Sequence, residues 1–188
     1  NVEADHSDWM KDVPDNQNLS LMSIPGTHDS AARNSGCGDA YNTQQWTIEN
    51  QLKAGIRFLD IRLRYFGDGF FLHHDICYLD QTFGTLLNTV EKFLKQHPTE
   101  TVLMRIKQEH LTVSDADFIN RFDNHVSYSS ATQAMYRERR IPDLGEVRGK
   151  IVVISNVKGL RGIPWDDLSI QDEYNMHYSN KATKVKNH

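Results

Sequence analysis

SIPGTHDS, residues 23–30, organises the rest of the sequence. An apolar run over 19–24 leads into its Pro-Gly break, and His28 and Asp29 follow side by side. Apolar residues that stop at such a break are typical of a buried strand ending at a turn, and strand ends carry the chemistry of α/β proteins. We therefore predict a strand over 19–24 that delivers His28 and Asp29 to a site. A His-Asp pair in a turn also serves as a local hydrogen-bonding device, so this signal needs support from elsewhere in the chain.

Composition limits what the chain can bind. Its 188 residues are enough for one domain with a sizeable core, and a formal net charge of −4 argues against nucleic acid as the main partner. No apolar run approaches the length of a transmembrane helix. The first residue is Asn1, which a removed signal peptide explains as well as an expressed fragment does. Cys37 and Cys77 form either one disulfide or two free thiols.

Helical and extended stretches alternate along the sequence. After the strand at 19–24, the apolar spacing predicts strands over 57–64, 70–74, 101–107 and 151–154. Helices are expected within 5–18, over 47–54, from Leu86 to the His97-Pro98 break, and from Ser114 to Phe122. Loops are expected over 31–43 and 159–167, and residues 169–174 can form a short extended piece.

This alternation indicates the fold class. Strands that alternate with helices favour βαβ units and a parallel sheet, and hence an α/β fold of the TIM-like (β/α) barrel type. Five strands do not close an eight-stranded barrel, so the chain is expected to hold roughly its first half. The open edge of such a half-barrel must be covered by further chain or by a partner.

Charged side chains gather on the predicted strands. Because side chains alternate along a strand, two sets share a face: Asp60, Arg62 and Arg64 on one strand, and Arg105 and Lys107 on another. One imidazole of His73-His74 can point the same way, and His28 lies at another strand end. Two imidazoles with cations suit phosphoryl transfer, with one base, one acid and positive charge on the phosphate oxygens. A salt-bridged strand end is the alternative interpretation for Asp60 and Arg62.

At this point the motifs resemble a known family. The motifs SIPGTHDS, FLDIR (58–62) and LHH (72–74) closely resemble the catalytic half of bacterial phosphatidylinositol-specific phospholipase C (PI-PLC). The likeness continues through HPTET (97–101), KQE (107–109), RGKIV (148–152) and QDEY (171–174). The resemblance implies a distorted (β/α) barrel, with residues 1–188 as a single X-type catalytic domain that is incomplete at its C-terminus.

The resemblance also implies a reaction and roles. The inositol 2-hydroxyl attacks phosphorus and gives diacylglycerol and inositol 1,2-cyclic phosphate, with no cofactor. His28 is implied as general base, His74 as general acid with Asp29 orienting it, and Arg62 as the phosphate-binding group. Lys107 and Asp172 are implied to hold inositol hydroxyls, and Tyr174 to stack near the ring. Asp60 is implied to hold the site residues in position without reacting itself.

The same likeness bears on metal and location. Calcium-dependent animal relatives carry an acidic residue at the position of Arg62, where a guanidinium would repel a cation and can replace its role. We therefore expect no metal; the alternative is a carboxylate cage of Asp29, Asp60 and Glu109, which would require Arg62 to turn away. The expected partner is phosphatidylinositol at a membrane surface, met transiently by a secreted protein.

Three departures from the family pattern are visible. The chain ends before the second barrel half, which in the family supplies a carboxylate partner for the base, so His28 is expected to lack that partner. Position 156 holds Asn where the well-known bacterial enzymes carry an inositol-binding Arg. The loop after His28 lacks their membrane-contacting Trp, which leaves Tyr41 and Trp165 as aromatic candidates for that role, although local packing of Trp165 is the plainer reading.

Two other functions remain open from the sequence. One is a metal-dependent glycerophosphodiester or sphingomyelin phosphodiesterase, which also places two His on early strands. The other is a catalytically inactive domain that binds inositol lipids. A chelator test separates the first from the metal-free reaction, and a turnover assay separates the second.

Overall fold

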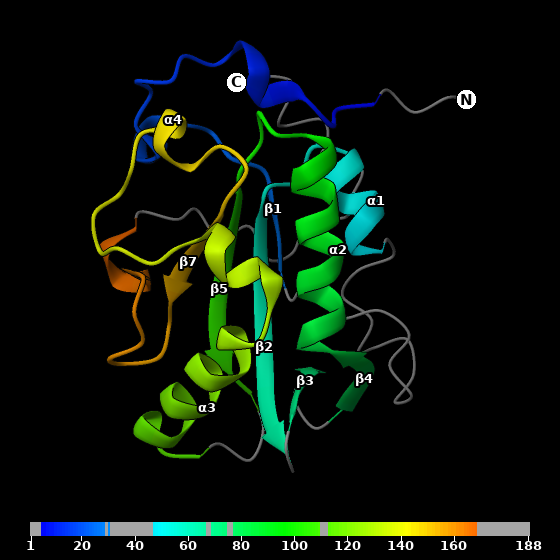
Figure 1. The fold of residues 1–188 in the computed structure, drawn as a ribbon, viewed down its shortest axis with the longest axis vertical. Helices are drawn as coiled ribbons and strands as arrows, with labels where there is room; N and C mark the ends of the chain where they lie inside the picture. The colour runs from blue at the N-terminus through cyan, green and yellow to red at the C-terminus, as the bar shows by residue number, and fades with distance from the viewer. Residues whose placement is uncertain are drawn as a thin grey trace.

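The computed structural model describes residues 5–28, 30, 47–66, 69–74, 77–109 and 113–168, and for 66, 69–74 and 77–81 it describes the backbone alone. Its strands are β1 (Gly26–Thr27), β2 (Phe58–Phe66), β3 (Gly69–His74), β4 (Cys77–Thr82), β5 (Val102–Gln108), β6 (Met135–Tyr136), β7 (Ile151–Ser155) and β8 (Ile163–Pro164). Its α-helices are α1 (Ile48–Lys53), α2 (Phe83–Gln96), α3 (Asp115–Ser127) and α4 (Leu144–Val147), shown in Figure 1.

The strands form one eight-stranded sheet whose path runs β4-β3-β2-β5-β7-β6, with β1 beside β2 and β8 beside β7. The central pairs are parallel, whereas β2-β3 and β3-β4 are antiparallel. Within the described residues the path does not return from β6 to β4, so the sheet is an arc of a barrel. The expected α/β half-barrel is therefore confirmed in its architecture.

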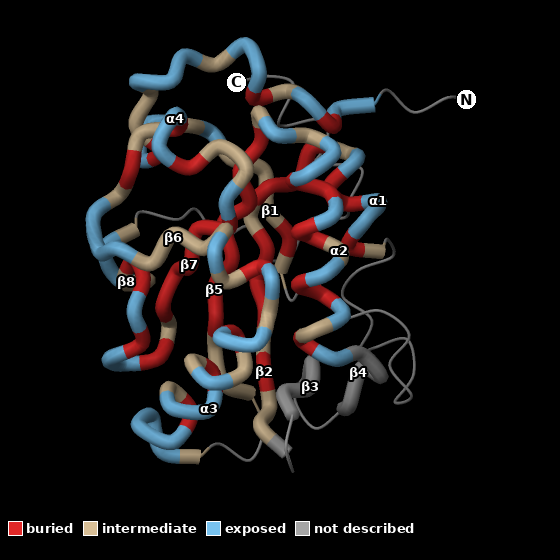
Figure 2. The backbone as a smooth tube through the Cα atoms, in the orientation of Figure 1, coloured by how far each residue is buried: buried red, intermediate tan, exposed pale blue. Residues whose placement is uncertain are grey.

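The two faces of the arc carry different side chains. Alternate residues of β2, β5 and β7 pack outward against α1, α2 and α3 in one core: Leu59, Ile61, Leu63, Val102, Met104, Ile106, Ile151 and Val153. Figure 2 shows this burial along the central strands, while the sides of α2 and α3 nearest the viewer are largely exposed. The other face becomes polar toward the carboxyl ends of the strands, and this is the face that builds the site.

The pairing register of β2, β5 and β7 shows where the interior face changes from apolar to charged. At the amino end, Phe58 pairs with Leu103 and Leu103 with Val152, which forms an apolar layer. Two residues further along, Asp60 pairs with Arg105, and the next layer pairs Arg62 with Lys107. Because equivalent positions two apart share a face, these charges lie together above the apolar layer.

The long helices follow from local sequence. α2 buries apolar residues at helical spacing against the sheet: Phe83, Leu86, Leu87, Val90, Phe93 and Leu94. The Thr82 hydroxyl accepts from the Thr85 N–H and starts α2, and the Ser114 hydroxyl accepts from the Asp117 N–H and starts α3. The predicted helix ending at His97-Pro98 and the Ser114 cap are both confirmed.

The predicted strand over 19–24 is wrong. Leu19–Leu21 forms a 3-10 turn that Asn18 caps, and Leu21 is 78% exposed. Leu19 instead joins Met10 in the core on the interior face, so these apolar residues fill the amino end of the arc. Only β1, two residues long, pairs with the sheet.

The expected helix within 5–18 reduces to one 3-10 turn, Trp9–Asp12. This N-terminal segment crosses the end of the arc where β2 and β5 begin (Figure 1). Two guanidinium groups hold it there. Arg57 donates to the carbonyls of His6 and Ser7, and Arg148 donates to the carbonyls of Met10 and Val13.

The prediction of five strands is also wrong, for two reasons. β6, β8 and β1 have two residues each, which is too short for a periodic pattern to reveal. In addition β3 turns back antiparallel to β2 and continues into β4, where a parallel strand was expected. The polar connection before β7 contains α4, which Asp143 and Glu146 start with a capping box. The predictions for 31–43 and 169–174 and the pairing of Cys37 with Cys77 lie outside the described residues.

Candidate active site

His28 lies beside β2 because β1 pairs with it in parallel. Gly26 faces Phe58 and Thr27 faces Leu59 in the register, which brings His28 to the level of Asp60. The approach needs glycine, since a Cβ on Gly26 would lie 3.0 Å from the Phe58 Cβ. As a result His28 Nδ1 lies 3.2 Å from Asp60 Oδ2.

A buried hydrogen-bond network fixes the turn that carries His28. The Thr27 hydroxyl donates to Gln51 Oε1 at 2.7 Å, and Gln51 Nε2 donates to the Ser30 carbonyl at 2.8 Å. The Asp60 N–H donates to the Ser30 hydroxyl, and the Ser30 N–H donates to the Asp60 carbonyl. Residues on both sides of His28 are thus tied to α1 and to β2. Gln51 was not singled out in the sequence, where nothing separates it from other polar residues of its helix.

Arg62 lies between two carboxylates. Its NH2 group is 3.2 Å from Asp60 Oδ2, and its NH1 group is 3.0 Å from Glu109 Oε2. The Arg62 side chain is 13% exposed and that of Asp60 is 4% exposed, so the pairs are largely shielded from water. Arg62 therefore does not turn away from Asp60 and Glu109, as the alternative carboxylate cage would require.

The contacts of Asp60 favour Nδ1 as the ring nitrogen of His28 that carries the proton. A carboxylate only accepts and a guanidinium only donates. Arg62 NH2 comes within 3.3 Å of His28 Nδ1, but a lone pair on that nitrogen would face the Asp60 carboxylate at 3.2 Å. A proton on Nδ1 lets Asp60 accept from both neighbours and leaves His28 Nε2 with the basic lone pair. The expectation that His28 lacks a carboxylate partner is therefore wrong, because Asp60 provides one.

Lys107 adds a cation beside Arg62. The two residues pair across β2 and β5, and Lys107 is half-buried. Within the described residues Lys107 forms no ion pair, so its charge is not already neutralised there. The described members of the predicted site thus come together as His28, Asp60, Arg62 and Lys107.

The other predicted residues can be placed only in part. His74 is the last residue of β3 and lies two residues beyond Leu72, where the pairing of β3 with β2 ends. Its side chain lies outside the described residues. Asp29, Asp172, Tyr174 and Tyr41 also lie outside them.

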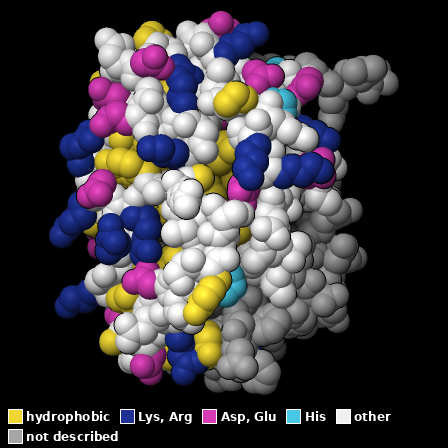
Figure 3. Space-filling model, viewed as in Figure 1, with side chains coloured by type: hydrophobic (Ala, Val, Ile, Leu, Met, Phe, Trp, Pro, Cys, Tyr) yellow, Lys and Arg dark blue, Asp and Glu magenta, His cyan; other side chains and the backbone are white. Residues whose placement is uncertain are grey.

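Trp165 packs locally. Its ring lies 3.6 Å from the Arg105 guanidinium carbon and 6.2 Å from the Phe58 ring, measured to ring centroids. These contacts hold Trp165 against the interior face and favour the local-packing interpretation over a membrane contact. Figure 3 shows Lys and Arg side chains interspersed with Asp and Glu on the helix-covered side, in keeping with the small net charge. No helix in the described ranges is long and apolar enough to span a bilayer.

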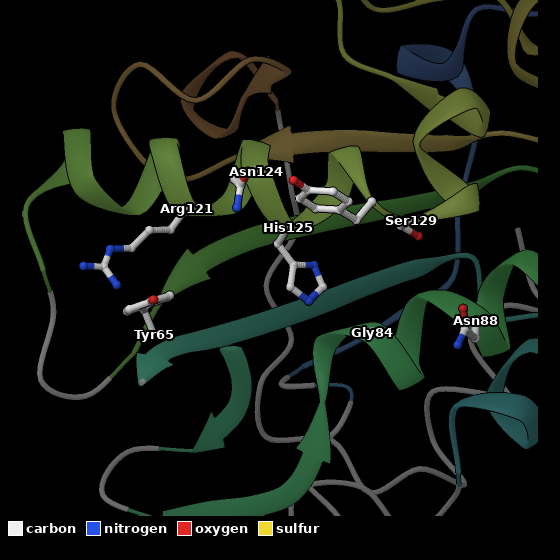
Figure 4. A pocket seen from close by; sticks show the side chains of 8 residues that line it. Tyr65, Gly84, Asn88, Arg121, Asn124, His125 and Ser129 are labelled. Carbon is white, nitrogen blue, oxygen red and sulfur yellow. The ribbon is translucent and has the colours of Figure 1, made fainter. Parts of the chain in front are cut away.

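A pocket of about 460 Å³ lies on the other face, between α2 and α3 (Figure 4). Its walls include Tyr65, Arg121 and His125, and Arg121 stacks 3.7 Å from the Tyr65 ring centroid. Tyr65 is on the outward face of β2, opposite to Arg62, so the sheet separates this pocket from the His28 cluster. The pocket therefore belongs to the helix layer and adds nothing to the acid–base chemistry.

Comparison with known proteins finds a family model and relatives that match this chain. The PI-PLC X family model (PI-PLC X 1) matches residues 16–145. A 1-phosphatidylinositol phosphodiesterase of Listeria monocytogenes is 36% identical over 157 residues, which cover 78% of this chain and 48% of the relative. A Staphylococcus aureus protein of the same name is 28% identical, with 95% of this chain and 68% of the relative covered.

A solved structure shares the fold. The phosphatidylinositol-specific phospholipase C from Listeria monocytogenes superposes with a TM-score of 0.73 at 30% identity, covering 97% of this chain and 72% of the other. The chain spans about half the length of the Listeria relative in the sequence match, and about seven tenths of the solved chain.

Proposed function

Because the chain belongs to the PI-PLC X family, we propose that it is the catalytic part of a phosphatidylinositol-specific phospholipase C. The observation that carries this proposal is the contact of His28 and Arg62 with one buried carboxylate, Asp60. That contact pairs a base with a phosphate-binding cation, which is what intramolecular attack on a phosphodiester requires.

In the proposed reaction, His28 Nε2 takes the proton of the inositol 2-hydroxyl while that oxygen attacks phosphorus. The bond from phosphorus to the glycerol oxygen breaks, and His74 gives its proton to that oxygen. The products are inositol 1,2-cyclic phosphate and diacylglycerol, and each histidine ends in the other's starting protonation state. Asp29 is proposed to orient His74, as the family resemblance implies.

Arg62 is proposed to stabilise the negative charge of the phosphate oxygens. Its guanidinium is held by Asp60 and Glu109 and faces the same layer as Lys107. Charge developing on the phosphate oxygens is stabilised by such a preorganised cation. This arrangement supports a reaction without metal, because Arg62 already engages two of the carboxylates that a cation would use. Lys107, Asp172 and Tyr174 are proposed to bind the inositol ring.

The proposal includes the setting of the enzyme. We propose that the protein is secreted and that it contacts phosphatidylinositol transiently at a membrane surface. The described arc is proposed to need the remaining part of the barrel, from further chain or a second fragment, to shield the site from water. This part is expected to cover the polar interior face next to Asp60 and Arg62.

The test is turnover of phosphatidylinositol by the complete protein, with phosphatidylcholine and sphingomyelin as rival substrates. Cleavage of phosphatidylinositol alone, unaffected by EDTA and not raised by calcium, is the expected result. His28→Ala should lower kcat by about 10²–10⁴-fold. As a matched control, His97→Ala removes a histidine that pairs with Asp8 outside the site, and activity should stay unchanged. A calcium requirement, or preference for sphingomyelin, would favour the metal-dependent phosphodiesterase, and binding without turnover would favour the inactive lipid-binding domain.

A further inference from the structure

Gln51 is a buried amide in a helix whose other buried side chains are apolar. α1 buries Ile48, Gln51 and Leu52, which share one face at helical spacing, and Gln51 is 0% exposed. Burying an amide costs free energy unless its oxygen and its N–H2 group both find partners. The partners of Gln51 therefore indicate what the residue does.

The Gln51 side chain has partners on both sides of His28. Its Nε2 donates to the Ser30 carbonyl at 2.8 Å, and its Oε1 accepts from the Thr27 hydroxyl at 2.7 Å. Thr27 is 4% exposed and Ser30 is 1% exposed, so water hardly competes for these hydrogen bonds. The amide thus bridges residues that precede and follow the proposed base.

These two partners determine how the amide is turned. A carbonyl oxygen only accepts, so the atom beside the Ser30 carbonyl must be the N–H2 group of Gln51. The amide oxygen is then left for the Thr27 hydroxyl, which can donate. An apolar side chain of similar length would fill the same space in α1 and would satisfy neither partner.

Ser30 connects this amide to Asp60. The Asp60 N–H donates to the Ser30 hydroxyl at 2.8 Å, and the Ser30 N–H donates to the Asp60 carbonyl at 2.8 Å. Asp60 Oδ2 in turn lies 3.2 Å from His28 Nδ1. Gln51 therefore holds the residue that is bound to the carboxylate partner of His28.

We propose that Gln51 is a positioning residue, whose amide holds Thr27 and Ser30 so that the His28 ring stays against Asp60 with its Nε2 free for the attacking hydroxyl. This inference rests on the proposed function for the reaction that His28 performs. Because Gln51 is fully buried, it acts through His28 and not on the substrate. A misplacement of about 1 Å in a reacting group can cost about 10²-fold in rate, so a hydrogen-bond network behind the base is able to control kcat.

The experiment uses the complete protein with phosphatidylinositol as the substrate. Gln51→Met keeps the length of the side chain, but its thioether cannot donate to Ser30 and accepts only weakly from Thr27. We expect kcat to fall by about 10–100-fold while KM changes by less than about 3-fold, because the variant leaves the proposed phosphate-binding group, Arg62, unchanged.

Val126→Ala is the matched control for a loss of stability. Val126 is 3% exposed in α3, so this variant leaves a cavity in the helix layer and lowers the unfolding temperature. Its kcat per folded molecule should stay unchanged, because it removes no hydrogen bond of the His28 turn.

Thr27 provides a second pair of variants, which also carries the test if Gln51→Met fails to fold. Thr27→Val removes the hydroxyl with little change of shape and should lower kcat in the same direction. Thr27→Ser keeps the donor and should retain most of the activity. Because both residues act through one network, the variant with both Thr27→Val and Gln51→Met should be about as slow as Gln51→Met alone.

The position of His28 is read by nitrogen NMR of its imidazole ring without substrate, with its signals identified by their loss in His28→Ala. The form protonated on Nδ1 should dominate in the unaltered protein and in Val126→Ala. Gln51→Met should show more of the form protonated on Nε2, because the ring no longer stays against Asp60. A merely structural Gln51 would lower the unfolding temperature and leave this balance unchanged.

The outcomes separate the two proposals. If the unaltered protein does not turn over phosphatidylinositol but the protonated ring nitrogen of His28 changes in Gln51→Met, the proposed function is overturned and the positioning of His28 stands. Normal turnover with an unchanged His28 ring in Gln51→Met would overturn this inference alone. Equal losses of kcat in Gln51→Met and Val126→Ala, or fully additive losses in the double variant, would also contradict it.

Discussion

Arg57 directly precedes β2 and Arg62 lies within it, and the two guanidinium groups are engaged in different ways. Arg57 is fully buried, and its guanidinium donates to the Glu100 carboxylate and to four carbonyls: those of Leu52, Ile56, His6 and Ser7. Burial lowers the pKa of Arg57 from its ordinary value, and the Glu100 carboxylate opposes that shift. Each nitrogen of this guanidinium therefore donates to an acceptor inside the fold.

Arg62 lies in a cluster that stays partly exposed. Its side chain is 13% exposed and contacts Asp60 and Glu109, and its NH2 group lies 3.3 Å from His28 Nδ1. A cation held in this way can meet a phosphate oxygen, as proposed above. The comparison teaches that a fully buried arginine holds the fold together, whereas a partly exposed arginine beside an imidazole is placed for the proposed contact with an anion.

The largest effect on stability is expected from replacing Arg57. Arg57→Met removes one partner of a fully buried pair and leaves Glu100 uncompensated, which costs about 3–5 kcal/mol of unfolding free energy. Urea unfolding measures this loss. Activity per folded molecule should stay near that of the unaltered protein, because Arg57 lies away from His28 and Lys107. The double variant Arg57→Met/Glu100→Gln should recover part of the loss, and no recovery would contradict the pairing.

The next largest effect is expected from replacing Arg62. Arg62→Gln removes a preorganised cation and should lower kcat by about 10²–10³-fold. Thermal unfolding should change little, because Asp60 keeps His28 and the more distant Arg105 as neighbours. Arg121→Gln, in the pocket outside the sheet, is the matched control and should leave kcat unchanged. Equal losses of kcat in the two variants would show that the charge of the whole surface matters more than this cluster.

The smallest expected effect concerns the helix layer. Burial lowers the pKa of His125 from its ordinary value of 6.5, so the unfolded chain takes up a proton at higher pH than the folded one. Stability should therefore fall as pH drops below the ordinary value and level off below the folded value. Urea unfolding at about pH 7.5 and about pH 5.5 should show a smaller difference in His125→Gln than in the unaltered chain. An unchanged difference would mean that His125 titrates alike in both states.

Sequence predicted the parts of the fold that depend on long local patterns. The apolar spacing of α2 and the Ser114 cap of α3 need no tertiary information, and both were found where expected. The run over 19–24 misled because Leu19 fills the amino end of the arc instead of pairing in the sheet, while Leu21 is exposed. The burial of Leu19 against residues that are distant in the sequence decides its conformation, and no local sequence pattern reveals that burial.

For the site, sequence supplied the residues but not their contacts. Alternation along a strand was enough to place Asp60 and Arg62 on one face. The contact of Asp60 with His28 depends on the register of the two-residue strand β1, which sequence did not reveal. The amide of Asn156 was noted only as a departure from a family pattern, and its hold on Arg105 needed the β5-β7 pairing.

The central claim is that His28, held by Asp60, starts an intramolecular attack. It is tested most directly by phosphorus NMR of phosphatidylinositol vesicles mixed with the complete protein in EDTA, in unaltered and Asp60→Asn forms. The account predicts that the signal of inositol 1,2-cyclic phosphate appears first with the unaltered protein, and that Asp60→Asn forms it at least about 10-fold more slowly. An acyclic inositol phosphate as the first product, or equal rates for the two proteins, would contradict it.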